Sequence, residues 1–82
     1  MKNLNIKILG SRCGNCQRLE KNVRQVVDAL GISATVQKVQ ELDQFIAYNI
    51  ARIPALVINE KVVSQGVVLP PEKIRELLQP KL

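Results

Sequence analysis

Two cysteines separated by two residues carry most of the chemical content of this 82-residue sequence, in the segment Cys13-Gly14-Asn15-Cys16. A cysteine at the amino-terminal end of a helix lies beside unpaired backbone N–H groups and the positive end of the helix dipole, and both favour thiolate over thiol. Arg12 would add to this effect. The spacing places Cys13 at the exposed tip of a following helix and Cys16 on its buried face. The pattern therefore predicts a reactive Cys13 backed by a second thiol.

This asymmetry predicts two roles in thiol–disulfide exchange. Cys13 attacks a substrate disulfide, and Cys16 then resolves the mixed disulfide, which releases reduced substrate and leaves a Cys13–Cys16 bridge to be reduced elsewhere. Gly14 and Asn15 leave access to Cys13 open, because neither carries bulk or an ionisable group. The alternative is that Cys13 and Cys16 have no chemical role and are two small apolar residues that occupy a loop and a helix face. The position of the CxxC pair between a strand and a helix favours the redox interpretation instead.

A metal site is the alternative use of the same two thiols. Two thiolates can bind a soft ion such as Cu(I), and residues 10–16 resemble the glycine-plus-CxxC loop of heavy-metal-associated domains. That family usually has Met where this chain has Ser11, and its βαββαβ order ends on a strand. Two thiolates are also incomplete for tetrahedral zinc without a partner. Carriage of Cu(I) or Zn by Cys13 and Cys16 is therefore kept as the second hypothesis.

Composition excludes several other classes of protein. Two cysteines are too few for a disulfide scaffold, and with no histidine neither a zinc finger nor a catalytic triad using histidine can be built. An aromatic content of 2% argues against single-stranded nucleic-acid binding, which stacks bases on rings. The net charge of +5 is spread among acids, which is typical of a solvated surface. We expect no nucleic-acid partner.

The amino-terminal residues bear on location. Polar side chains interrupt any apolar stretch in residues 1–7, so we expect no signal-peptide core, no membrane span and no membrane partner. The cytoplasm is the expected compartment. In that reducing environment a close pair of thiols is more typical of reactive or metal-binding groups than of a permanent bridge.

Apolar spacing predicts the elements that hold the two cysteines. Alternation over residues 4–9 indicates a first strand that ends at Gly10, and alternating β-branched residues over 34–39 indicate a second. Between them an apolar stripe with helical spacing runs from Cys16 to Leu30, and Gly31 ends the helix. Because a helix joins these two strands in one short run, the strands are expected to pair in parallel.

The rest of the chain supplies two more strands and two more helices. An apolar stripe at Leu42, Phe45, Ile46 and Ile50 indicates a second helix, which Pro54 ends. Strands are expected over 55–58 and 61–64, joined by a tight turn at residues 59–60 whose type the sequence leaves open, and a final helix is expected from about residue 71. The predicted order is βαβαββα, in a single domain over residues 1–82.

On these residues the chain resembles the small glutaredoxin-like thioredoxins, or redox-active disulfide proteins, across essentially its full length. The matching segments are Gly10 with residues 13–16, the helix to Gly31, residues 53–59, Val62-Val63 and Gly66. The resemblance implies an α/β thioredoxin-like fold of three layers with a four-stranded mixed sheet. It also implies a cis Ile53–Pro54 bond, with Arg12, Ile53 and Pro54 in the substrate groove.

The same resemblance implies the activity and its partners. We expect a thiol–disulfide oxidoreductase that exchanges with protein disulfides, is reduced by a thioredoxin-reductase-like enzyme, and needs neither metal nor any cofactor besides its Cys13–Cys16 disulfide. Glutaredoxins carry a paired-glycine segment after the last strand, and Gly66 stands alone here, so no glutathione site is expected. We expect a monomer, because no exposed apolar stripe is left over.

Two basic residues depart from the thioredoxin pattern. Arg12 stands where a Trp usually precedes the first cysteine, and Lys7 stands where a buried acid is usual. We therefore consider that Cys16 is deprotonated by water or by Lys7. The alternative is that Lys7 is a solvated strand residue.

Arg52, two residues before Pro54, has two interpretations. In one hypothesis it forms a basic rim of the groove together with Arg12, and in the other it is a solvated residue at the end of a helix.

Overall fold

The computed structural model describes residues 3–11 and 13–81. The elements in chain order are β1 (Leu4–Leu9), α1 (Gly14–Leu30), β2 (Ala34–Val39), α2 (Leu42–Ala47), β3 (Ala55–Ile58), β4 (Lys61–Gln65), α3 (Pro71–Leu78) and a final 3₁₀ turn (Gln79–Lys81). The predicted order βαβαββα is confirmed. The helix α1 begins two residues earlier than its apolar stripe indicated, because Cys13 acts as its N-cap.

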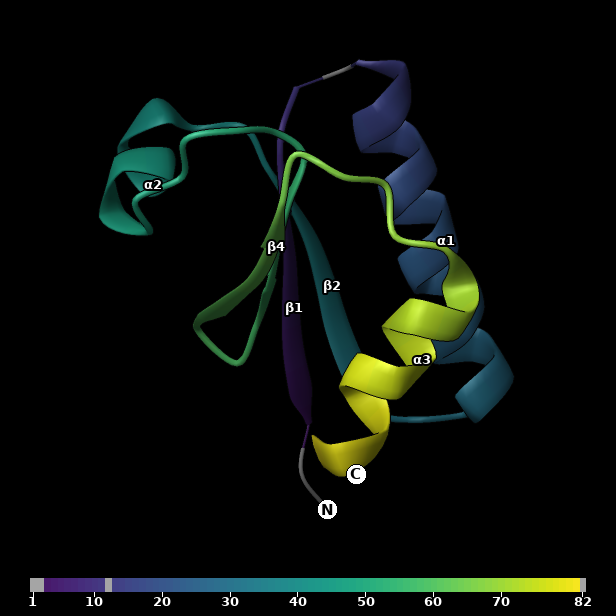
Figure 1. Cartoon of the computed structure of the whole chain (residues 1–82). Helices are drawn as coiled ribbons and strands as arrows, with labels where there is room; N and C mark the ends of the chain where they lie inside the picture. The colour runs from purple at the N-terminus through teal and green to yellow at the C-terminus, as the bar shows by residue number, and fades with distance from the viewer. Residues whose placement is uncertain (1–2, 12, 82) are drawn as a thin grey trace.

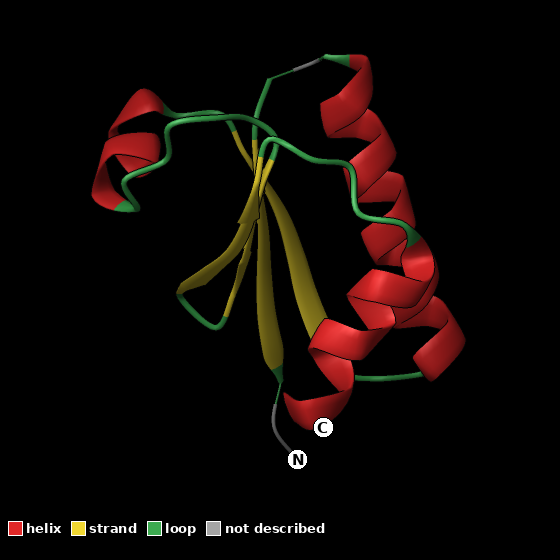
Figure 2. Ribbon diagram, viewed as in Figure 1, coloured by secondary structure: helices red, strands yellow, loops and turns green. Residues whose placement is uncertain are grey.

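The four strands form one mixed sheet in the order β2-β1-β3-β4. The central strand β1 pairs in parallel with β2 and antiparallel with β3, and β3 pairs antiparallel with β4. Figure 1 shows α1 and α3 on one side of this sheet and α2 on the other, and Figure 2 shows the same three layers coloured by type of structure. The expected α/β architecture is therefore confirmed.

Alternation along β1 divides the core into two clusters, because successive side chains of a strand point to opposite faces. The larger cluster joins Ile6 and Ile8 of β1 to Leu19 of α1 and to Ile74 and Leu78 of α3. The smaller one lies on the other face, where Leu9 and Val57 pack with the half-buried Phe45. The long helix α1 is thus held by both the sheet and α3.

The helix α2 corrects one expectation. None of its six residues is fully buried, and Leu42 and Ile46 are 72% and 68% exposed. Fewer than two turns cannot carry a long stripe, so only Phe45 of the helix and residues after it reach the smaller cluster. The premise that no apolar stripe is left exposed is therefore wrong, and the monomeric state loses that support.

The turn between β3 and β4 is now defined. Asn59 and Glu60 have φ of 49° and 70°, the left-handed pair that a two-residue type I′ hairpin requires. Asn59 is tied to β1, since its N–H donates to the Asn5 carbonyl at 2.7 Å and its side-chain oxygen accepts from the Asn5 N–H at 2.9 Å.

In the part of the chain that the structure describes, no helix combines the length and apolarity needed to cross a membrane.

Candidate active site

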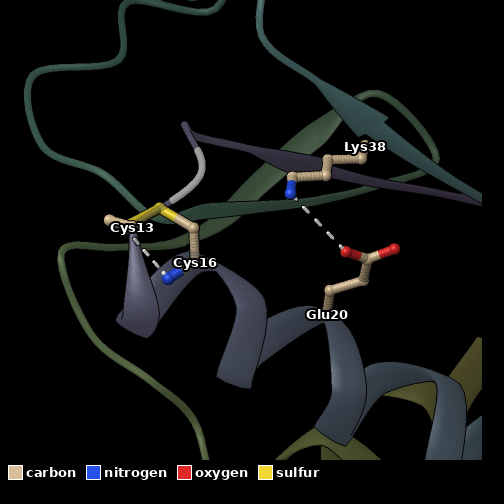
Figure 3. Close-up of a disulfide and its surroundings, with 4 residues drawn as sticks. All are labelled: Cys13, Cys16, Glu20 and Lys38. Atoms are coloured by element: carbon tan, nitrogen blue, oxygen red, sulfur yellow. Dashed lines mark hydrogen bonds and ion pairs between the residues drawn. A yellow bond between two sulfur atoms is a disulfide. The ribbon is translucent and has the colours of Figure 1, made fainter.

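A disulfide joins Cys13 and Cys16 at the amino-terminal end of α1, with their Cα atoms 5.2 Å apart (Figure 3). Cys13 is the N-cap: its Sγ accepts a hydrogen bond from the Cys16 N–H at 3.1 Å, and its carbonyl accepts from the Gln17 N–H at 3.1 Å. No acidic residue lies in the first turn of α1. The positive end of the helix dipole therefore acts on Cys13 without an opposing charge on its own turn.

The two sulfurs differ in access. Cys13 is half-buried, whereas Cys16 is 0% exposed. Cys16 lies on the face of α1 that carries Leu19 and Val23 into the larger core cluster. An incoming molecule can thus reach the first sulfur and not the second, which is the asymmetry that the spacing predicted.

Gly10 lies close to both the disulfide and Pro54. A Cβ at Gly10 would lie 2.5 Å from Cys16 Sγ, 3.1 Å from Cys16 Cβ and 3.8 Å from Pro54 Cα. Only glycine leaves room for the three segments to meet, because Cβ contacts below 3.0 Å essentially do not occur in proteins. The structure therefore brings Pro54 and Cys16 together beside one residue.

The segment that leads into Pro54 is held by the end of β4. The Ile53–Pro54 peptide bond is cis, Pro54 is buried, and Ile53 is 40% exposed. The Gly66 N–H donates to the Pro54 carbonyl at 2.9 Å. The side-chain carbonyl of Gln65 accepts from two backbone N–H groups, those of Ala51 at 2.9 Å and Arg52 at 3.3 Å. Sequence reasoning missed this role of Gln65.

Of the two arginines of the predicted basic rim, the structure describes Arg52. Arg12 lies outside the described residues. Arg52 is exposed, and its Cβ and Cδ would each be 3.1 Å from a Cβ at Gly66, so its aliphatic stem lies over that glycine. The structure thus brings Cys13, Cys16, Ile53 and Pro54 to one end of the molecule, with Arg52 beside Gly66.

Lys7 does not face Cys16. Its amine donates to the Tyr48 hydroxyl at 2.9 Å and forms an ion pair with Glu60 at 3.2 Å, and the Tyr48 hydroxyl donates to Glu60. Hydrogen bonding to Tyr48, with a smaller contribution from Glu60, raises the pKa of Lys7 although partial burial opposes this. Alternation places Lys7 on the face opposite Ile6 and Ile8, and α1 covers the latter. The hypothesis that Lys7 deprotonates Cys16 is therefore wrong.

A second pair of charges, which sequence reasoning missed, lies one turn along α1 from Cys16. Figure 3 shows Glu20 of α1 and Lys38 of β2 reaching toward each other, with 4.0 Å between Oε1 and Nζ. The other carboxylate oxygen of Glu20 accepts from Arg24 at 3.1 Å. The spacing of Cys16 and Glu20, four residues apart on a helix, was the available signal for this neighbourhood.

No group of three or more His, Cys, Asp or Glu side chains that could hold a metal ion occurs among residues 3–11 and 13–81.

Comparison with known proteins places this geometry in a family. The family model for the thioredoxin domain matches residues 4–79. The chain is 37% identical to a thioredoxin of Methanothermobacter thermautotrophicus over 75 residues, which cover 92% of this chain and 97% of that one. It is 31% identical to a thioredoxin of Methanocaldococcus jannaschii over 74 residues, covering 90% and 85%.

Solved structures agree on the fold. Chloroplastic thioredoxin z superposes with a TM-score of 0.76 at 21% identity, covering 95% of this chain and 77% of that one. A thioredoxin from Halobacterium salinarum superposes with a TM-score of 0.73 at 23% identity, covering 94% and 73%.

Fold, cysteine pair and named relatives together define a thiol–disulfide oxidoreductase. Within that class the chain belongs to the thioredoxin family.

Proposed function

We propose that this protein reduces disulfides of other proteins, with Cys13 as the nucleophile and Cys16 as the resolving thiol. The observation that carries the proposal is the capping position of Cys13, whose sulfur accepts the Cys16 N–H at the start of a helix while Cys16 itself is buried. The same N–H can donate to the Cys13 thiolate after reduction, and a charge-assisted bond of this kind lowers a thiol pKa.

The exchange proceeds in two balanced steps. The Cys13 thiolate attacks one sulfur of the substrate disulfide, a Cys13–substrate bond forms, and the other substrate sulfur leaves as a thiolate that takes a proton from water. The Cys16 thiol then loses its proton and attacks Cys13 Sγ. The Cys13–Cys16 bond forms and the second substrate sulfur leaves, so that two electrons have passed to the substrate.

The groove for the substrate is formed in this proposal by Ile53 and Pro54, with Arg12 on its rim. Support comes from the exposure of Ile53 and from the close approach of both Pro54 and Cys16 to Gly10. An extended substrate segment would pair with the backbone before Pro54 in the manner of an added strand. Arg52 would favour acidic residues near the target disulfide.

Regeneration requires an electron donor. In this proposal a thioredoxin-reductase-like enzyme reduces the Cys13–Cys16 bridge in the cytoplasm, and the bridge itself is the redox centre without a further cofactor. The net transfer is two electrons and two protons from that enzyme to the substrate, with this protein alternating between dithiol and disulfide.

Turnover with a protein disulfide tests the proposal. Reduction of insulin by dithiothreitol should be accelerated by the wild-type protein and not by Cys13→Ser, and the reduced protein should show a Cys13 thiol pKa near or below about 7. In parallel, the reduced protein is titrated with Cu(I) against a competing chelator. Tight Cu(I) binding, an ordinary Cys13 pKa and no acceleration of insulin reduction would replace the proposal with metal carriage.

A further inference from the structure

Resolution of the mixed disulfide requires that buried Cys16 lose a proton. No charged or polar side chain is fully buried in the described part of the chain, and Lys7 lies on the opposite face of the sheet. The strand β1 presents only apolar side chains, such as Ile6 and Ile8, toward α1. With β1 excluded, the acceptor for the Cys16 proton is either water or a side chain of another element, and α1 and β2 supply half-buried charges on this face.

Glu20 is the carboxylate that meets this requirement. It follows Cys16 by four residues on α1, which makes the two side chains neighbours on one helix face with Cβ atoms about 6 Å apart. Its side chain is only 23% exposed, which is low for a carboxylate on a surface helix. Proton transfer to a general base can pass through one water, so the thiol and the carboxylate need not touch.

Two cations hold the Glu20 carboxylate in place. Lys38 approaches one oxygen from β2 at 4.0 Å, and Arg24 binds the other from the next turn of α1 at 3.1 Å. Lys38 is also only 23% exposed, and it lies beside Ile8 in the register of β1 and β2. Figure 3 shows Glu20 reaching from α1 toward Lys38 of the sheet, with the Cys13–Cys16 bridge at the start of the same helix.

The other charged residues of the packed elements are turned outward. The helix α3 packs on α1 through Ile74 and Leu78. Its charged side chains are all exposed: Glu72, Lys73, Arg75 and Glu76. The charges that face Glu20 in the described structure are thus Lys38 and Arg24.

We propose that Glu20, positioned by Lys38 and Arg24, accepts the proton of Cys16 during resolution. The Cys16 S–H bond breaks and its proton passes through a water to the Glu20 carboxylate. The Cys16 sulfur attacks Cys13 Sγ, the Cys13–Cys16 bond forms, and the substrate sulfur leaves as a thiolate. Glu20 then returns the proton to solvent. This inference rests on the proposed function and deepens it, because it assigns the proton transfer of the second step.

A purely electrostatic role predicts the opposite effect. A carboxylate near a thiol disfavours the thiolate, so removing the charge of Glu20 without a proton-transfer role would speed the attack by Cys16. Loss of a proton acceptor slows it. The sign of the change therefore separates the two possibilities.

The test uses a chromogenic aromatic disulfide, 5,5′-dithiobis(2-nitrobenzoate), with the fully reduced protein. The first thiol is released when Cys13 attacks, and the second when Cys16 resolves the adduct. For Glu20→Gln we expect an unchanged first phase and a second phase at least about tenfold slower at neutral pH, which converges on wild type as the pH rises and hydroxide replaces the acceptor. Glu76→Gln, an exposed glutamate on α3, is the matched control and should change neither phase.

A double-mutant cycle adds a second readout. Lys38→Met should slow the second phase in the wild-type background and have little effect in the Glu20→Gln background, because Lys38 acts through Glu20. A second phase that is unchanged or faster in Glu20→Gln, or an undiminished Lys38 effect in that background, overturns the inference. A wild-type protein with no second phase at all would instead contradict the proposed function.

Discussion

Cys13 and Cys16 carry the same side chain in two different surroundings. Cys13 caps α1 and is half-buried, whereas Cys16 is inaccessible and lies against the core and Gly10. This contrast follows from three-residue spacing at the start of a helix, which turns the second cysteine inward. It is the reason that the two thiols can be given separate roles without any histidine or acid in the motif.

Gly10 is the residue whose lack of a side chain most directly limits the site. We expect Gly10→Ala to destabilise the oxidised protein by roughly 1–3 kcal/mol, because the added Cβ would overlap with Cys16 Sγ, which the disulfide ties to Cys13. Gly14→Ala is the matched control, since nothing lies within 4 Å of a Cβ there and α1 favours alanine. Urea unfolding of both oxidised variants measures the difference. Equal unfolding midpoints would contradict the close approach.

Individual residues show where sequence reasoning reached its limit. The Cys13–Cys16 pair and Pro54 were predictable, because motif position and family resemblance both bear on them. The surroundings of Lys7 and Glu20 were not, because each depends on which residues of other elements face it: Tyr48 and Glu60 for one, Lys38 for the other. Sheet pairing and helix placement create these neighbours, and spacing along the chain does not reveal them.

At the scale of elements, strands were more predictable than helix ends. The bounds of β1, β2 and β3 are those that the sequence predicted. The start of α1 was set two residues too late, since Gly14 and Asn15 resemble loop residues although Cys13 caps the helix. The turn at Glu60 adopts a positive φ that glutamate disfavours, although its side chain forms an ion pair with Lys7.

The end of β4 positions the segment before Pro54, and Gln65 is the residue that does so. Gln65→Ala should raise the amide hydrogen-exchange rates of Ala51 and Arg52 roughly fivefold to tenfold, because each N–H loses its acceptor, a bond worth about 1 kcal/mol. Gln37→Ala, an exposed glutamine of β2, should leave both rates unchanged. Exchange at residues 51 and 52 that matches wild type in Gln65→Ala would contradict this positioning role.

At the scale of the whole molecule, stability rests on the larger cluster between the sheet, α1 and α3. Leu78 of α3 is 0% exposed within it, whereas Leu42 of α2 is 72% exposed. Leu78→Ala should therefore cost about 2–5 kcal/mol of unfolding free energy, and the same change at Leu42 at most about 0.5 kcal/mol. Chemical denaturation of the two variants compares them directly. Similar losses at both positions would mean that α3 does not complete the core.

The contacts among Lys7, Tyr48 and Glu60 should make stability depend on pH. The hydrogen bond from the Tyr48 hydroxyl, and to a smaller extent that from Lys7, lowers the pKa of Glu60 from 4.5. The stability that these contacts of Glu60 contribute is therefore present above pH 4.5 and is lost as the pH falls through the lowered pKa. The pKa of Lys7 is raised from 10.5, so its contribution is present below that pH and is lost on further alkalinisation. The Tyr48→Phe variant should therefore be less stable than wild type at neutral pH, and it should lose less stability than wild type on acidification. Thermal unfolding at pH values on both sides of 4.5 tests this, and an acid dependence as steep as that of wild type would contradict it.

Trapping of the mixed disulfide tests the central claim, that Cys13 attacks and Cys16 resolves, most directly. The reduced Cys16→Ser protein, mixed with a disulfide-bonded substrate protein, should accumulate a covalent complex through Cys13 that intact-mass analysis detects and dithiothreitol reverses. Wild-type protein should release its substrate, and Cys13→Ser should form no stable complex because its remaining thiol is buried. A complex that forms through Cys16 in Cys13→Ser as readily as through Cys13 in Cys16→Ser would contradict the assignment.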